Sequence, residues 1–252
     1  MNWKKFPLPL TILSFAVSLE LAIVPVLPAR SQLPSATASV TFNPPGDGLP
    51  EETIGGASRS PNGKVCPEDA AALDRGVMPL IPATNHGQTI ATHPTIYLYM
   101  PKTSASQVFL SLRDKEGNNI YQEFLPAIAT GSIVGFQLPA EAPALETGKT
   151  YKWSMAIVCG GLLRADSPTV SGWIKRVEAD ATTIGQLDRD PSLEGAALYG
   201  AKGLWYETIG TLVELRRQQP EDATITENWK NLLFSVGLDA IASQPVSQQV
   251  SQ

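Results

Sequence analysis

The chain has 252 residues, of which 43% are hydrophobic and 17% charged, and its formal net charge is −5 at pH 7. This length suits one domain, or one domain with an appendage, and it is enough to bury a hydrophobic core without many disulfides. The acidic balance and the lack of a dense lysine and arginine cluster argue against nucleic-acid binding, which usually needs a basic patch or stripe. We therefore expect a globular protein with no nucleic-acid partner.

Residues 1–31 have the pattern of a secretory signal peptide. A short positive start is followed by the mostly apolar stretch 6–27 and by the small residues of Ala29-Arg30-Ser31, which is the order that a signal peptidase recognises. An uncleaved membrane anchor is the alternative, since about 20 apolar residues span a bilayer. Glu20 argues against it, because an acidic residue near the centre of a span costs roughly 2.5–3.5 kcal/mol on insertion scales. We expect cleavage, export to the periplasm or the extracellular medium, and no membrane span in the mature protein.

Cys66 and Cys159 are the two cysteines of the sequence. In an oxidising compartment an isolated pair most simply forms a disulfide. A bridge that closes so long a loop would stabilise the fold by up to about 4.6 kcal/mol in the chain-entropy model. Two free thiols are the alternative, whereas zinc would need further ligands that the neighbouring sequence lacks. The sequence therefore predicts a Cys66–Cys159 disulfide and no metal site.

The first part of the exported chain differs in composition from the rest. Residues 32–65 are rich in Pro, Gly, Ser and Thr and poor in large apolar residues, which predicts a flexible leader. Short β-like segments separated by turn signals follow within residues 66–180, a pattern typical of a sandwich rather than of a βαβ fold. We expect these strands at residues 95–100, 108–113, 119–124, 131–138, 151–159 and 170–177.

One local pattern indicates the kind of sandwich. The segment Leu145–Trp153 resembles the entry to strand F of fibronectin type III-like sandwiches. In these domains a Leu precedes a Gly turn, and a Tyr closes the corner through its hydroxyl; Gly148 and Tyr151 occupy these positions. We therefore expect a mainly β protein in which residues 66–180 form an immunoglobulin/fibronectin III-like antiparallel β-sandwich. Such a scaffold does not by itself indicate a function.

The C-terminal residues 181–243 are predicted to be helical. Asp190-Pro191 combines a cap residue with Pro at the first helical position, and apolar residues at helical spacing continue as far as Pro220. Thr224–Glu227 has capping-box spacing and predicts the start of a second helix. The two helices would form an αα-hairpin packed on the sandwich, followed by a disordered tail at residues 244–252.

A series of short motifs extends in a fixed order from Gly55 to Ile241. They are Gly55-Gly56 with Arg59 and Cys66, Pro94-Thr95 with Tyr99-Met100-Pro101, Tyr151-Lys152-Trp153 with Cys159, Gly172-Trp173-Ile174 with Arg176, Tyr199-Gly200-Ala201 with Gly203-Leu204-Trp205-Tyr206, and Trp229 with Leu232-Leu233 and Gly237-Leu238. In this order the motifs resemble the cyanobacterial exported proteins classed as domain-of-unknown-function family 928. That family has no established activity, so the resemblance implies export and this layout and supplies no mechanism.

No residue is predicted to be catalytic, and no cofactor is expected. The two histidines, His86 and His93, lie in a Thr/Pro/Gly-rich approach to the first strand without a nucleophile pattern, so we expect solvated loop residues. Calcium binding by Asp188, Asp190 and Glu194 is an alternative to a helix cap with solvated charge, although EF-hand spacing is missing. A pair of carboxylates that converges in three dimensions also stays open, because sequence spacing does not reveal such a pair.

The aromatic residues are the remaining candidates for a binding surface. Trp153, Trp205 and Trp229 are expected in the core. Tyr206 is expected to point off the buried stripe of its helix, which would make it a possible partner surface.

Together these observations predict an exported, non-catalytic interaction or structural module of the cell envelope. Its helical hairpin or a sheet edge would contact an envelope or secreted protein partner. The alternative function is an enzyme that acts on envelope polysaccharide or peptide with convergent carboxylates.

Overall fold

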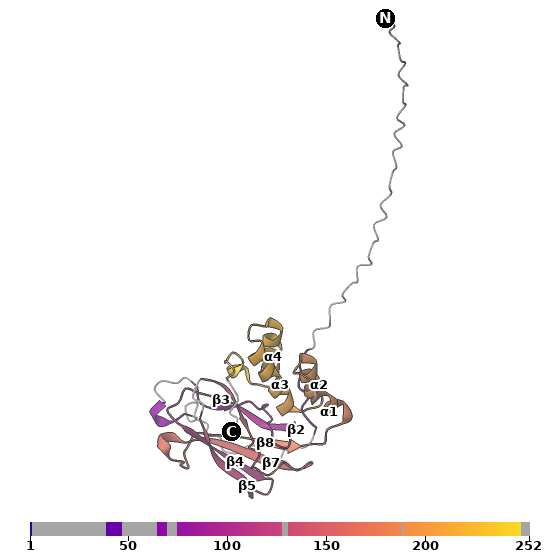
Figure 1. The fold of residues 1–252 in the computed structure, drawn as a ribbon. Helices are drawn as coiled ribbons and strands as arrows, with labels where there is room; N and C mark the ends of the chain where they lie inside the picture. The colour runs from indigo at the N-terminus through magenta and orange to yellow at the C-terminus, as the bar shows by residue number, and fades with distance from the viewer. Residues whose placement is uncertain (2–38, 47–64, 70–74, 128–130, 188, 248–252) are drawn as a thin grey trace. The chain divides into compact units, whose positions relative to one another are not determined.

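The computed structural model places one folded unit within Ala38–Gln252 (Figure 1). The predicted signal peptide beyond Met1, most of the predicted leader, Asp188 and the last five residues lie outside the described residues. The structure describes residues 1, 39–46, 65–69, 75–127, 131–187 and 189–247.

Within these residues the chain forms two sheets and a helical C-terminal part. The strands are β1 (Met78–Pro79), β2 (His86–Thr89), β3 (Thr95–Met100), β4 (Gln107–Asp114), β5 (Asn119–Pro126), β6 (Ser132–Gln137), β7 (Thr150–Ile157) and β8 (Thr169–Arg176). The strand order is β1-β3-β6 in the smaller sheet and β2-β8-β7-β4-β5 in the larger one. The β-rich body is thus confirmed. The prediction of a wholly antiparallel arrangement is wrong, because β2 runs parallel to β8.

The predicted strands correspond closely to β3 to β8, because their sequences alternate or are rich in β-branched and aromatic residues. Strand β7 is the clearest case, since Tyr151, Trp153, Met155 and Ile157 are all buried. The turn before β7 uses Gly148 at a positive φ of 82°. The Tyr151 hydroxyl accepts a hydrogen bond of 3.0 Å from the backbone N–H of Glu146, as the corner pattern predicted.

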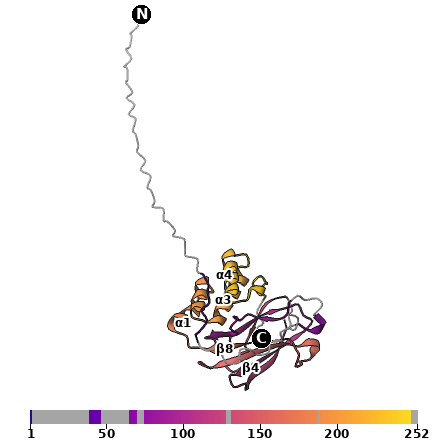
Figure 2. The same cartoon turned by 180° about the vertical axis from the view of Figure 1, so that it is seen from behind.

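Four α-helices follow the last strand, and they lie together beside the sheets in both views (Figures 1 and 2). They are α1 (Ala181–Leu187), α2 (Leu193–Ala201), α3 (Trp205–Gln218) and α4 (Ala223–Ser235), and short 3-10 turns occur at Pro67–Asp69, Cys159–Gly161 and Asp239–Ile241. The helical C-terminus is confirmed. The prediction of one continuous helix before Pro220 is wrong, because Gly203 adopts a φ of 73° and separates α2 from α3.

The two predicted helix starts are also shifted. Ser192, not Asp190, caps α2, because its side chain accepts a hydrogen bond from the N–H of Gly195 at 3.0 Å. Asp222, not Thr224, caps α4, and its carboxylate accepts from the N–H of Ile225 at 3.0 Å. In both helices the capping side chain satisfies an N–H of the first turn that has no acceptor within the helix.

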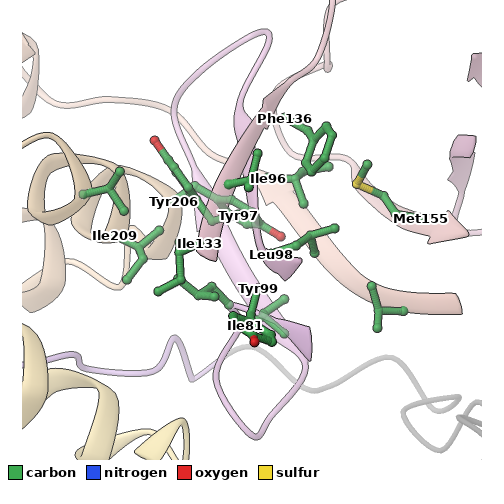
Figure 3. Close-up of a cluster of buried hydrophobic side chains, with 14 of the residues drawn as sticks. Ile81, Ile96, Tyr97, Leu98, Tyr99, Ile133, Phe136, Met155, Tyr206 and Ile209 are labelled. Carbon is green, nitrogen blue, oxygen red and sulfur yellow. The ribbon is translucent and has the colours of Figure 1, made fainter. Parts of the chain in front are cut away.

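The sheets and helices share one hydrophobic core. Trp153, Trp205 and Trp229 are fully buried in it, as predicted. Figure 3 shows how α3 closes this core with Tyr206 and Ile209. The other labelled side chains come from β3, β6, β7 and the segment before β2: Ile81, Ile96, Tyr97, Leu98, Tyr99, Ile133, Phe136 and Met155. The core therefore depends on elements from distant parts of the sequence.

Part of the predicted flexible leader is packed against the helices. The N–H of Val40 donates a 2.8 Å hydrogen bond to Oδ1 of Asn228, and both residues are buried. The ring of Phe42 meets the ring of Trp205 edge to face, with 4.9 Å between centroids. The prediction of a flexible leader is wrong for residues 39–46, because Val40 and Phe42 are apolar anchors within a polar composition.

The start of the predicted disordered tail is also ordered. The N–H of Ile133 donates to the carbonyl of Pro245 at 2.8 Å, and the N–H of Ser247 donates to the carbonyl of Ile133 at 2.9 Å. Val246 thereby forms a parallel bridge with Ile133 of β6. The prediction is therefore wrong for residues 245–247, which cover the β6 edge of the smaller sheet.

Candidate functional site

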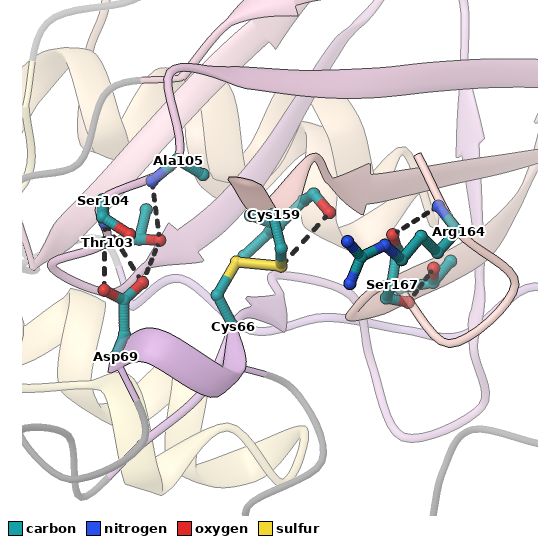
Figure 4. Close-up of a disulfide and its surroundings, with 10 residues drawn as sticks. Cys66, Asp69, Thr103, Ser104, Ala105, Cys159, Arg164 and Ser167 are labelled. Atoms are coloured by element: carbon teal, nitrogen blue, oxygen red, sulfur yellow. Dashed lines mark hydrogen bonds between the residues drawn. A yellow bond between two sulfur atoms is a disulfide. The ribbon is translucent and has the colours of Figure 1, made fainter. Parts of the chain in front are cut away.

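Cys66 and Cys159 form the predicted disulfide, with 5.5 Å between their Cα atoms. The bridge joins the residue before the 3-10 turn Pro67–Asp69 to the 3-10 turn Cys159–Gly161, which follows β7 (Figure 4). Asp69 secures the same turn, because its carboxylate accepts hydrogen bonds from the Thr103 hydroxyl at 2.5 Å and from the Ser104 N–H. This part of the molecule therefore has a structural role, because it fixes the turn Pro67–Asp69 to the folded body.

One group with the spacing of a metal site occurs among the described residues, and it consists of Cys66, Glu68 and Cys159. Both of its sulfur atoms are engaged in the disulfide. A disulfide offers no thiolate to zinc. The group therefore does not form a metal site in the oxidised protein.

The prediction of solvated loop histidines is wrong for His86, whereas His93 does lie in the loop before β3 and is partly accessible. His86 lies in β2 and is only 4% exposed, because β2 pairs with β8 and places His86 beside Trp173. His93 is half-buried, and its Nε2 atom lies 2.9 Å from the carbonyl oxygen of Ala142. Both side chains are thus built into the fold.

Tyr206 does not form a partner surface, so that prediction is wrong. The residue is 6% exposed. Its hydroxyl accepts a 2.7 Å hydrogen bond from Nε1 of Trp153 and donates to the carbonyl of Trp173 at 3.3 Å. Burial raises the pKa of this hydroxyl above its usual value. Tyr206 is therefore a neutral bridge between α3 and the larger sheet.

The reason for this burial lies in strand β2. A Cβ atom on Gly87 would lie 2.9 Å from Cβ of Trp205 and 3.0 Å from the Tyr206 ring. The missing side chain lets α3 pack directly on β2. This packing buries a face of α3 that helical periodicity predicted to be exposed. The sequence signal that could have revealed this is Gly87 itself, within a short polar segment.

A pocket of about 260 Å³ lies on another side of α3, where α1, α2 and the loop between them meet it. It is lined by Gln186, Leu187, Arg189, Asp190, Pro191, Tyr199, Glu207, Gly210 and Thr211. Of the acidic cluster considered for calcium, Asp190 lies at this pocket and Glu194 is exposed in the first turn of α2. The pocket is the candidate functional site.

Glu207 is held at the wall of this pocket by the end of β2. Its Oε1 atom accepts a hydrogen bond from the Thr89 hydroxyl at 2.6 Å and from the N–H of Ile90 at 3.0 Å. The Thr89 oxygen itself accepts from the N–H of Ala91 at 3.1 Å, so its hydrogen is free to point at Glu207. Oε1 therefore receives two donors.

The second oxygen of Glu207 has a different environment. Oε2 is shielded from water and has no hydrogen-bond partner among the described residues, although other parts of the side chain are accessible. Burial raises the pKa of this carboxyl, and the hydrogen bonds from Thr89 and Ile90 oppose the shift only in part. Because Oε1 already accepts two hydrogen bonds, the proton of the neutral acid belongs on Oε2.

Tyr199 supplies a second polar group to the pocket. Its side chain is buried, yet its hydroxyl forms no hydrogen bond with any described residue. Burial and, secondarily, the nearby Glu207 raise the pKa of the hydroxyl. The side chains of Arg189 and Asp190 are exposed at the rim, and neither forms an ion pair with another described residue. Several polar groups in one pocket are thus available to a ligand.

Sequence reasoning missed Glu207, Tyr199 and Thr89. The signal that could have drawn attention to Glu207 is a carboxyl in the first helical turn next to Trp205 and Tyr206, because charge is rare beside two buried aromatic residues. Its partner Thr89 lies 118 residues earlier, so spacing along the chain could not reveal the contact.

The family model of a Domain of Unknown Function (DUF928) matches residues 54–246, and the chain belongs to this family. The matched range contains both cysteines and every residue that lines the pocket. A comparison with curated proteins finds no match. No helix in the described part of the chain has the length and apolar character needed to cross a membrane.

Proposed function

We propose that this protein is exported and acts as a non-catalytic binding module of the cell envelope, with the pocket between α1, α2 and α3 as its ligand site. The observation that carries the proposal is a pocket that contains the Tyr199 hydroxyl, which has no hydrogen-bond partner among the described residues, together with the exposed side chains of Arg189 and Asp190. Ligand sites typically combine an apolar wall with a few polar groups that fix orientation.

The signal-peptide pattern of residues 1–31 and the disulfide support export. Edman sequencing of the exported protein tests this part of the proposal, and a start at Gln32 is the expected result. A start at Met1 would instead favour a retained anchor. In the exported protein, an envelope or secreted protein partner would receive or deliver the bound ligand.

We propose in addition that the two sheets have an immunoglobulin/fibronectin III-like arrangement with one parallel edge strand. The support is the Tyr151 hydroxyl, which closes its corner on the backbone of Glu146 as in such sandwiches. This chain differs from a simple sandwich because the C-terminal residue Val246 pairs with Ile133 of the edge strand β6. A crystal structure of the exported chain would test the arrangement.

Ligand binding can be tested by heat denaturation of the purified exported chain, with and without the small-molecule fraction of the envelope. A ligand at ten times its Kd adds about 1.4 kcal/mol of stability, which raises Tm by about 3–6 °C for a chain of this size. Thr211→Trp fills the pocket and should abolish the shift. Asn231→Trp, at an exposed position of α4, is the matched control and should retain it. Equal shifts in both variants, or none in the wild type, would contradict the proposal.

A hydrolase is the second candidate, because Asp190 and Glu207 line the same pocket. One is exposed, and burial raises the pKa of the other, as expected of a carboxylate and a general acid that act on a polysaccharide. Release of reducing ends from envelope polysaccharide, lost in both Glu207→Gln and Asp190→Asn, would support this alternative. If the wild type releases no reducing ends, the hydrolase is contradicted and the binding module remains the proposed function.

A further inference from the structure

The charges at the pocket indicate what kind of ligand it accepts. Arg189 and Asp190 at the rim carry opposite charges, and Oε1 of Glu207 already accepts hydrogen bonds from Thr89 and Ile90. The other polar lining groups belong to Gln186, Tyr199 and Thr211, which are uncharged. The charges of the two exposed rim groups therefore cancel, so they do not offset the cost of removing an ionic ligand from water.

The size and the mixed chemistry of the lining restrict the ligand further. At about 260 Å³ the pocket lies below the roughly 300–1,000 Å³ of sites for drug-sized ligands. Tyr199, Leu187 and Pro191 provide apolar surface. Arg189 can only donate hydrogen bonds and Asp190 can only accept them, whereas a ligand hydroxyl does both. A small ligand with several hydroxyl groups and an apolar face satisfies all of these conditions.

We propose that the pocket binds one uncharged sugar unit, a monosaccharide or the end of a glycan, and that the Tyr199 hydroxyl hydrogen-bonds to it. This inference rests on the proposed function and names its ligand class. Tyr199 is the informative residue, because its hydroxyl has no hydrogen-bond partner among the described residues while its ring is buried. A hydroxyl in that position can serve a ligand without any loss to the fold.

Isothermal titration of the purified exported chain tests the inference with four probes: glucose, N-acetylglucosamine, glucosamine and glucuronate. Glucose or N-acetylglucosamine should bind saturably, and the cationic and anionic analogues should bind at least tenfold more weakly. Tyr199→Phe should weaken the neutral sugar roughly 2–12-fold, the range of one net hydrogen bond. Tyr121→Phe, which removes a hydroxyl bonded to Glu123 on β5, should leave affinity unchanged.

A charge-altering variant makes the test sharper. Asp190→Asn leaves the lining with the positive charge of Arg189, so glucuronate should gain affinity relative to glucose. The inference is overturned if no neutral sugar binds, if Tyr199→Phe binds as tightly as the wild type, or if the charged analogues bind equally well. If the sugars fail while the envelope fraction still raises Tm in the Asn231→Trp control, the ligand class is wrong and the binding function stands. If that shift is also missing, the proposed function fails with it.

Discussion

Helix α3 carries two neighbouring residues that face different environments. Tyr206 faces the larger sheet, where its hydroxyl bonds to both Trp153 and Trp173. Glu207 faces the pocket, where its Oε2 and the hydroxyl of Tyr199 have no hydrogen-bond partner among the described residues. The hydroxyl of Tyr206 is fully engaged, whereas that of Tyr199 is not, although Nε1 of Trp173 on the core side also has no hydrogen-bond partner among the described residues. Saturated polar groups stabilise a fold, and available ones are what a ligand can use.

The largest effect is expected on the core side, from Trp205→Ala. Trp205 is 0% exposed, packs on Phe42, and donates from Nε1 to the carbonyl of Leu80 at 2.9 Å. Its truncation should lower the free energy of unfolding by about 3–5 kcal/mol, measured by urea denaturation. Phe234→Ala, at an exposed position of α4, should change it by less than about 0.5 kcal/mol. Similar losses in both variants would mean that α3 does not close the core.

Tyr206→Phe tests the role of the tyrosine hydroxyl on the core side, for comparison with the Tyr199 hydroxyl on the pocket side. Removal of this hydroxyl leaves Nε1 of Trp153 buried without its acceptor, so unfolding should become easier by about 1–3 kcal/mol. A double-mutant cycle with Trp153→Phe should give a coupling of at least about 0.5 kcal/mol, because the two residues share one hydrogen bond. Strict additivity would show that the bridge contributes nothing.

Glu207→Gln should change how stability depends on pH. Burial raises the pKa of the folded-state carboxyl, so the wild type has its full stability contribution below the unfolded pKa of about 4.3 and loses it as the pH rises through the folded pKa. The Glu207→Gln variant has no titrating group at this position. Its free energy of unfolding relative to that of the wild type should therefore rise from about pH 4 upward, by at most about 1.4 kcal/mol per pH unit. Urea denaturation between pH 4 and 9 measures this difference.

Glu214→Gln on the same helix is the control with the opposite sign. Arg217 donates to Glu214 and lowers the pKa of that carboxyl. This contribution is present above the unfolded pKa and is lost as the pH falls through the folded pKa. The variant should therefore be less stable than the wild type at neutral pH, by about 0.2–1 kcal/mol, and equal to it in acid. Parallel pH profiles for the two variants would contradict the assignment of Glu207 as a buried acid.

The smallest effect on stability is expected for Tyr199→Phe. Its hydroxyl has no described hydrogen-bond partner to lose, so the free energy of unfolding should stay within about 0.5 kcal/mol of the wild type. Urea denaturation beside Tyr206→Phe provides the measurement. A loss as large as that of Tyr206→Phe would show that the Tyr199 hydroxyl is a structural group and would remove the contrast between the two sides of α3.

Local patterns predicted the parts of the fold that depend on neighbouring residues. Strand β3 was predicted at its true bounds, because Thr95–Met100 is β-branched and aromatic and Pro101 ends it. Strand β2 was missed, because its three polar residues and Gly87 are buried only by pairing with β8 and by the packing of α3, both from more than eighty residues later. The split between α2 and α3 was missed because Leu198 and Trp205 keep helical spacing across it, although Gly203 was visible between them.

The candidate site could not be predicted, because segments that are distant along the chain come together to form it. Tyr206 was assigned to the surface from the periodicity of one helix, and that argument fails when β2 covers a second face of the helix. Glu207 looked like an ordinary first-turn carboxylate, a position that favours negative charge. Its position against the end of β2 desolvates it instead, and this burial raises its pKa although the hydrogen bond from Thr89 opposes the shift.

The two ends of the folded unit also constrain when the protein can fold. Val40 bonds to Asn228 across 188 residues, and Pro245 and Ser247 bond to Ile133. Neither contact can form until nearly the whole chain has been synthesised. During synthesis the chain must therefore lack its finished core, and an unfolded chain is the form that can be threaded through a narrow export channel. The segments at Val40 and at residues 245–247 are therefore the last parts of the fold to be completed.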